Sequence, residues 1–100
     1  MTLYVGDALR IVVSATDPET SLPLSPAPTG AHVDYWAPGV DRKTNSPTTP
    51  NVAMTYRSVT QDFVLFQDTT GFAPGKWTFR VTVTGSTYSN FEYSTFKLSV

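Results

Sequence analysis

The sequence predicts an all-β fold, an antiparallel sandwich of about seven short strands. Apolar and polar residues alternate with a period of two along several stretches, as they do where one face of a strand is buried. Turn-forming residues separate these stretches, and none of them has the apolar spacing of a helix. With 100 residues the chain is expected to form one domain, 1–100.

Two stretches show the alternation most clearly, and we expect their apolar positions to face the core. Those positions are Leu9, Ile11, Val13 and Ala15 in the first stretch, and Trp77, Phe79, Val81 and Val83 in the second. The intervening positions of the second stretch are three threonines and one arginine, which suit an exposed sheet surface.

Shorter strands are expected over 31–36, 52–56 and 63–66, the last of them apolar on both faces. In the final stretch Phe91 and Tyr93 have the opposite parity to Phe96 and Leu98. We therefore expect a β-bulge near Ser94–Thr95, or a strand that starts later.

Loops and turns rich in proline, glycine and polar residues are expected between the strands. They cover Asp17–Thr20, Leu22–Gly30, Ala37–Gly39, Asp41–Asn51, Gly71–Gly75 and Gly85–Asn90. Short strands with such turns between them are the pattern of an immunoglobulin-like sandwich.

Composition argues against several classes of function. Seven Lys and Arg residues are scattered among eight Asp and Glu residues, so nucleic acid is not an expected partner. The absence of cysteine excludes disulfides, thiolate metal sites and cysteine nucleophiles. No apolar run is long enough to span a membrane, so no membrane partner is expected. A chain that begins at Met1 without a visible signal peptide is expected to be a complete product made in the cytoplasm, or else a trimmed piece of a longer protein with an added Met.

No constellation of residues predicts catalysis. The single histidine, His32, shares a strand face with Asp34, but no motif frames a nucleophile beside them, so a surface pair is expected. The carboxylates are dispersed, the spacing of a calcium loop is missing and the glycines are isolated. The expectation is a protein that is not an enzyme and has no cofactor and no metal site.

Three features are candidates for partner binding. Parity sends Trp36 outward if Tyr35 faces the core, so Trp36 is either an exposed interface anchor or is turned into the core by a bulge. Val64 and Phe66 share the other face of their strand, where they form an apolar patch with Val12 nearby, or lie beneath the segment Leu22–Pro28.

The third candidate is the loop Asp41–Asn51, which contains the basic pair Arg42 and Lys43. Binding residues in sandwiches often lie on loops held by a rigid scaffold, and this loop could become ordered only in a complex. The alternative is a plain solvated connection.

Two segments carry a family resemblance. Tyr4-Val5-Gly6-Asp7 is followed by an apolar strand, by Asp17-Pro18 and by Leu22-Pro23-Leu24. In the second half Thr70-Gly71-Phe72 precedes Pro74-Gly75-Lys76-Trp77-Thr78-Phe79-Arg80. Together these segments resemble small immunoglobulin-like virion proteins of tailed bacteriophages, over nearly the whole chain.

The resemblance implies a virion structural protein assembled in the bacterial host cytoplasm. A capsid decoration protein that docks on the major capsid protein is the first expectation, and a head–tail or tail-associated protein is the second. Its partners would be capsid or other virion proteins, and copies of itself. A carbohydrate- or cell-surface-binding module is the alternative from another class, with Trp36 and Tyr88 stacking on sugars.

Overall fold

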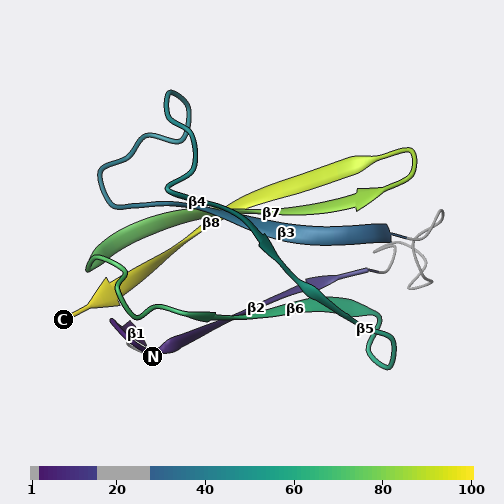
Figure 1. Ribbon diagram of the computed structural model, residues 1–100, viewed down its shortest axis with the longest axis horizontal. Coiled ribbons are helices and arrows are strands. Elements are labelled where there is room, and N and C mark those ends of the chain that lie inside the picture. Colours follow the sequence, from purple (N-terminus) through teal and green to yellow (C-terminus); the bar gives the residue numbers. More distant parts are fainter. Residues whose placement is uncertain (1–2, 16–27) are drawn as a thin grey trace.

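The computed structural model describes residues 3–15 and 28–100, and within these ranges the chain forms eight strands in two packed layers (Figure 1). The larger sheet has the order β1 (Leu3–Tyr4), β8 (Ser89–Ser99), β7 (Gly75–Gly85), β3 (Pro28–Trp36) and β4 (Thr49–Ala53). The smaller sheet has the order β2 (Ala8–Ser14), β6 (Asp62–Asp68) and β5 (Thr55–Arg57). The predicted all-β sandwich is confirmed. The expected turn Asp17–Thr20 lies outside the described residues, as does most of Leu22–Gly30.

The inner faces of the two sheets carry the two alternations that the sequence shows most clearly. Ile11 and Ala15 from the first stretch are buried, and so are Trp77 and Val83 from the second. The other predicted inner positions of both stretches are partly buried and pack against the same core. Both predicted core faces are therefore confirmed.

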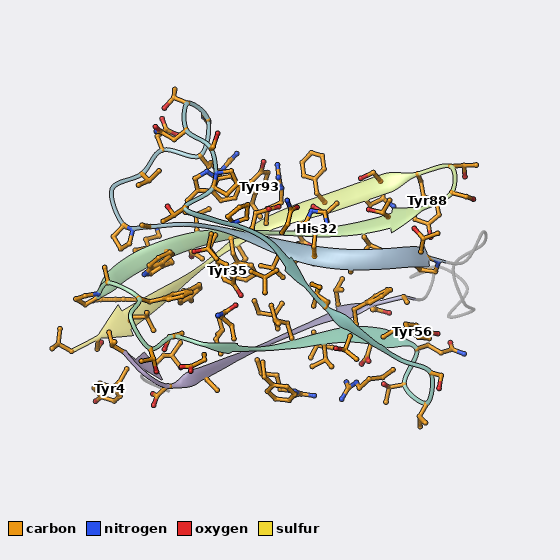
Figure 2. All side chains as sticks on the ribbon, viewed as in Figure 1. Tyr4, His32, Tyr35, Tyr56, Tyr88 and Tyr93 are labelled. Carbon is orange, nitrogen blue, oxygen red and sulfur yellow. The ribbon has the colours of Figure 1, made fainter. Side chains whose placement is uncertain are left out.

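Aromatic rings fill the core under the larger sheet. Trp77 stacks between Phe72 and Phe96, at ring-centroid distances of 4.6 and 6.3 Å. The indole Nε1 of Trp77 donates a hydrogen bond of 2.8 Å to the Ala73 carbonyl, which satisfies its polar atom inside the core. Tyr35 is fully buried and meets Phe72 edge to face, and Figure 2 shows it between the two layers.

One predicted strand, 52–56, divides between the two sheets. β4 pairs with β3 in the larger sheet, whereas β5 pairs with β6 in the smaller one. Met54 lies between them, buried, and its amide donates to the Ala31 carbonyl at 3.0 Å. The prediction of one continuous strand was wrong, because the chain crosses here and connects the two layers along one flank of the sandwich.

The N-terminal segment crosses between the sheets in the same way. β1 belongs to the larger sheet and β2 to the smaller, and Gly6 lies between them with a φ of 96°, which favours glycine. The buried Thr69 hydroxyl accepts from the Gly6 amide and donates to the Asp7 carbonyl, at 3.0 and 2.6 Å. These bonds hold the crossing in place.

The last two strands form a long regular hairpin. β7 and β8 keep one register from Gly75–Leu98 to Thr84–Ser89, so the expected bulge near Ser94–Thr95 is absent from this ladder. Phe91 and Phe96 instead belong to opposite faces of one continuous strand. β1 pairs with β8 in the parallel direction, an exception to the predicted antiparallel sandwich.

Tyr35→Phe tests the buried phenol, whose Oη has no hydrogen-bond partner among the described residues. At pH 7 the variant should have a free energy of unfolding within about 1 kcal/mol of the wild type, or higher, because it loses only an unpaired polar atom. Burial raises the pKa of Tyr35 above its ordinary value of 10.0. Above that pH only the unfolded state ionises, so the wild type should lose stability relative to the variant as pH rises. Urea unfolding of both proteins at pH 7 and at a pH above 10 measures their difference in stability. A difference that does not change with pH would contradict this expectation.

Candidate protein-binding surface

The candidate residues lie on the two outer faces of the sandwich. Val64 and Phe66 are on the smaller sheet, and Trp36 is on the larger one. Arg42 and Lys43 lie in the loop between β3 and β4, which rises from the outer side of the larger sheet (Figure 1). The structure therefore separates the five predicted residues into two groups on opposite sides of the domain.

The smaller sheet carries an apolar patch on its outer face, which we call the β2–β6 patch and define as Val12, Val64 and Phe66. Val12 lies directly opposite Val64 in the β2–β6 ladder, and Phe66 is the diagonal neighbour of Val12. Phe66 is 64% exposed and Val12 is 43% exposed. The predicted outward direction of Phe66 is thus matched by real exposure.

Val64 differs from the expectation in one respect. It faces away from the core, as predicted, but it is only 7% exposed. β6 is the central strand of its sheet, so Val64 has Val12 on one side and Thr55 on the other. Its neighbours cover it, and Val64 is the base of the patch rather than an exposed contact.

The alternative in which the segment Leu22–Pro28 covers this face falls mostly outside the described residues. Its last residue, Pro28, begins β3 in the larger sheet. Phe66, for its part, remains one of the most exposed large apolar side chains of the domain.

A fixed pair of charges borders the β2–β6 patch. Arg57 donates two hydrogen bonds to the carboxylate of Asp62, from Nε at 2.8 Å and from a terminal nitrogen at 2.7 Å. The Thr60 hydroxyl donates to the same carboxylate at 2.8 Å. The hydrogen bond from Arg57 is the main reason that the pKa of Asp62 lies below its ordinary value. An apolar centre with a polar border is the general arrangement of protein–protein interfaces.

Trp36 is not exposed. Its side chain does lie on the outer face of the larger sheet, as parity predicts, but it is only 2% exposed. The loop between β3 and β4 closes over it, and its Nε1 donates a hydrogen bond of 3.0 Å to the Asn45 carbonyl. Both alternatives for Trp36 are therefore wrong, because a loop buries it on the outer face and no bulge turns it into the core.

The basic pair has two different environments. The Arg42 guanidinium lies 3.9 Å from the centroid of the Tyr93 ring, and Tyr93 in turn contacts Trp36. Lys43 is exposed, and its backbone amide donates to the Asp41 carboxylate at 2.9 Å. Arg42 thus contributes to the cover of this face, while the side chain of Lys43 points into solvent.

Beside Trp36 lies a buried carboxylate. Asp34 accepts two hydrogen bonds from Arg80, at 3.3 and 3.0 Å, and one from the Asn51 amide at 2.9 Å. His32 Nε2 is 3.5 Å from the same carboxylate, on the outer side of the sheet (Figure 2). Hydrogen bonding of the Arg80 guanidinium to the Asp34 carboxylate is the main reason that the pKa of Arg80 is raised. The expected surface pair of His32 and Asp34 is instead part of a network around a buried carboxylate, which ties β3 to β7 and to Asn51 of β4.

Sequence reasoning did not bring Tyr93 and Arg80 together with Trp36. The available signal was parity, since Arg80 and Tyr93 both occupy outward positions of their strands. Which outward residues meet depends on the pairing of β3 with β7 and of β7 with β8, and the spacing along the chain does not contain that register.

Comparisons of the chain with protein-family models, with curated proteins and with solved structures each found no match. Among the described residues no three His, Cys, Asp or Glu side chains are grouped as metal ligands would be. In residues 3–15 and 28–100 there is no helix long and apolar enough to cross a membrane.

Trp36→Ala should lower the free energy of unfolding by about 3 kcal/mol, because it removes a buried indole and leaves a cavity between loop and sheet. Phe91→Ala is the control, since Phe91 lies on the same face but is 63% exposed, and its replacement should cost less than about 1 kcal/mol. Equilibrium denaturation in urea measures both. Equal stability of Trp36→Ala and the wild type would contradict the burial of Trp36.

Proposed function

We propose that the protein is a non-catalytic virion structural protein of a tailed bacteriophage, and specifically a capsid decoration protein. It docks on the major capsid protein through the β2–β6 patch. The observation that carries the docking proposal is the exposure of Phe66 and Val12 around the covered Val64. The phage context rests on the resemblance of the segments around Tyr4-Val5-Gly6-Asp7 and Pro74-Gly75-Lys76-Trp77.

Contrast between the two outer faces favours the smaller sheet as the docking face. The larger sheet is partly covered by its own loop, and the outward side chains of Asp34, Arg80 and Trp36 are engaged with one another, which leaves Phe91 as an exposed large apolar side chain of this face. The β2–β6 patch has a rigid ladder beneath it and an ordered ion pair at its border. A preorganised apolar surface loses little side-chain freedom on binding, which favours affinity.

The burial and the hydrogen bonds of Asp34, the strongest candidate for an acid–base group, support a non-catalytic role. Asp34 is 2% exposed and its carboxylate already accepts bonds from Arg80 and from a backbone amide. A carboxylate committed in this way holds strands together rather than exchanging protons with a substrate.

The sugar-binding alternative loses its main support. Trp36 is under a loop, so its ring has no open face on which a sugar could stack. The ring of Tyr88 is half-buried and packs over Gly85 in the hairpin turn. No observation on the described residues favours this alternative over docking on a protein.

Phe66→Asp should abolish docking while the domain stays folded, because a side chain that is 64% exposed contributes little to the core. The affinity for phage heads purified without this protein should fall at least about 30-fold, as expected for an interface residue worth about 2 kcal/mol. Cosedimentation with such heads measures it. Phe91→Asp is the matched control, since Phe91 is 63% exposed on the other outer face and should leave docking unchanged.

Two results would overturn this proposal. One is the absence of the wild-type protein from purified virions and its failure to sediment with heads. The other is an equal loss of docking in both aspartate variants, which would show that the β2–β6 patch is not the docking face. Circular dichroism confirms that each variant is folded before it is compared.

A further inference from the structure

Within the described residues, both sheets leave one flank of the sandwich open. In the described residues β2 pairs with β6 alone, so its other edge has no strand partner. On the same flank β8 pairs with β1 only at Leu98 and Ser99, and no other described strand lies along the edge of its earlier residues. The two free edges face each other across a groove.

The ladder shows which backbone groups of β2 point into this opening. Bonds from Thr69 N–H to the Asp7 carbonyl and from Ala15 N–H to the Gln61 carbonyl mark hydrogen-bonded pairs at both ends of the β2–β6 ladder. Hydrogen-bonded and non-hydrogen-bonded pairs alternate along an antiparallel ladder. The N–H and C=O groups of Ala8, Arg10 and Val12 are therefore directed away from β6, toward the open flank.

The groove between the edges has an apolar floor and a volume of about 680 Å³. Inward-facing side chains of β2 and β7 form this floor: Leu9, Ile11, Val13, Phe79, Val81 and Val83. Leu9, Val13, Phe79 and Val81 are only partly buried, although they point into the core. A further strand on this flank would cover them.

We propose that the edge of β2 from Ala8 to Val12 binds an extended segment of a partner polypeptide, which adds to the smaller sheet as a fourth strand. Peptide groups spaced every second residue along an edge are satisfied by another peptide backbone, and alternate side chains of the added strand would reach the apolar floor. The segment would be about five to seven residues long and would alternate apolar and polar side chains.

A single extended arm fits this site better than the edge of a second copy of the domain. Edge-to-edge pairing of two β2 strands would join two sheets side by side, and it would leave the floor of each groove uncovered. An isolated strand can lie between the edges of β2 and β8 and cover the floor as well.

The site also extends the proposed docking surface. Val12 belongs to the β2–β6 patch and also lines the groove, so a strand added to β2 would lie beside the patch. The identification of the arm as part of a capsid protein rests on the proposed function. The strand-binding edge itself rests on the ladder and on the floor of the groove.

Arg10→Pro is the decisive variant. The Arg10 amide is directed away from β6, so proline removes a group that the arm would use while the β2–β6 bonds remain, and edge strands tolerate proline at such positions. Arg10→Ala is the matched control, because it removes the side chain and keeps the amide. Thr95→Pro is the corresponding proline variant on the β8 rim of the groove. Gly85 N–H bonds to the Tyr88 carbonyl, which marks a hydrogen-bonded pair of the β7–β8 ladder. Because such pairs alternate with non-hydrogen-bonded ones, the Thr95 amide is directed away from β7.

The probe is a soluble synthetic peptide of about nine residues in which valine alternates with threonine and lysine. Binding should slow hydrogen exchange of the Arg10 and Val12 amides at least tenfold, with no slowing at Thr95. Arg10→Pro should weaken peptide binding at least tenfold, whereas Arg10→Ala and Thr95→Pro should stay within about twofold. If Arg10→Pro does not fold by circular dichroism, Ala8→Pro replaces it, since the Ala8 amide points the same way.

Three outcomes would overturn the strand-binding proposal: no protection at Arg10 and Val12, equal peptide binding by Arg10→Pro, or protection at Thr95 instead. Concentration-dependent dimerisation that protects Arg10 without peptide would also overturn it, in favour of pairing between copies.

Binding to phage heads separates the strand-binding proposal from the proposed docking on the β2–β6 patch. If heads bind Arg10→Pro normally but not Phe66→Asp, docking on the β2–β6 patch stands and the assignment of the arm to a capsid protein falls. If the peptide protects β2 but heads bind no form of the protein, strand addition stands and docking on the capsid falls.

Discussion

A mismatch between the two sheets is the constraint on which the rest of the structure depends. In the described parts of the chain five strands face three, and the inner side of each sheet is apolar, so the smaller sheet does not cover everything that the larger one presents. On one flank the chain crosses at Met54 and connects the layers there. On the other flank β2 and β8 leave a groove with an apolar floor. Burial of apolar surface drives such domains together, so an uncovered floor favours a further strand.

The two outer faces differ in how far the chain covers them. On the larger sheet a loop closes over Trp36, and the buried charge of Asp34 is balanced by Arg80 and by a backbone amide. This face is held by internal interactions. On the smaller sheet Phe66 and Val12 remain exposed around Val64, with the Arg57–Asp62 pair at the border. The molecule therefore presents one outer face that its own loop partly covers, where Phe91 stays exposed, and one with an apolar patch that continues into the open flank through Val12.

Much of the fold could be predicted from the sequence, because strand alternation is a local property. The core faces of 9–15 and 77–83 are as expected, and Phe66 is outward and exposed. The division of 52–56 at Met54 was not predictable, since Val52, Met54 and Tyr56 alternate smoothly across it. The parallel pairing of β1 with β8 and the continuous register around Ser94 depend on contacts between distant segments. Those contacts leave no periodic signal along the chain.

The sequence by itself determined the inward or outward direction of residues in the clearly alternating strands, because successive side chains of an extended backbone point to opposite faces. Only the tertiary structure decided which outward residues stay accessible. Trp36, Val64 and Phe66 all point away from the core, yet a loop covers the first and neighbouring strands cover the second. Exposure of an outward side chain depends on what packs beside it and over it, and that packing is set by residues far away in the sequence.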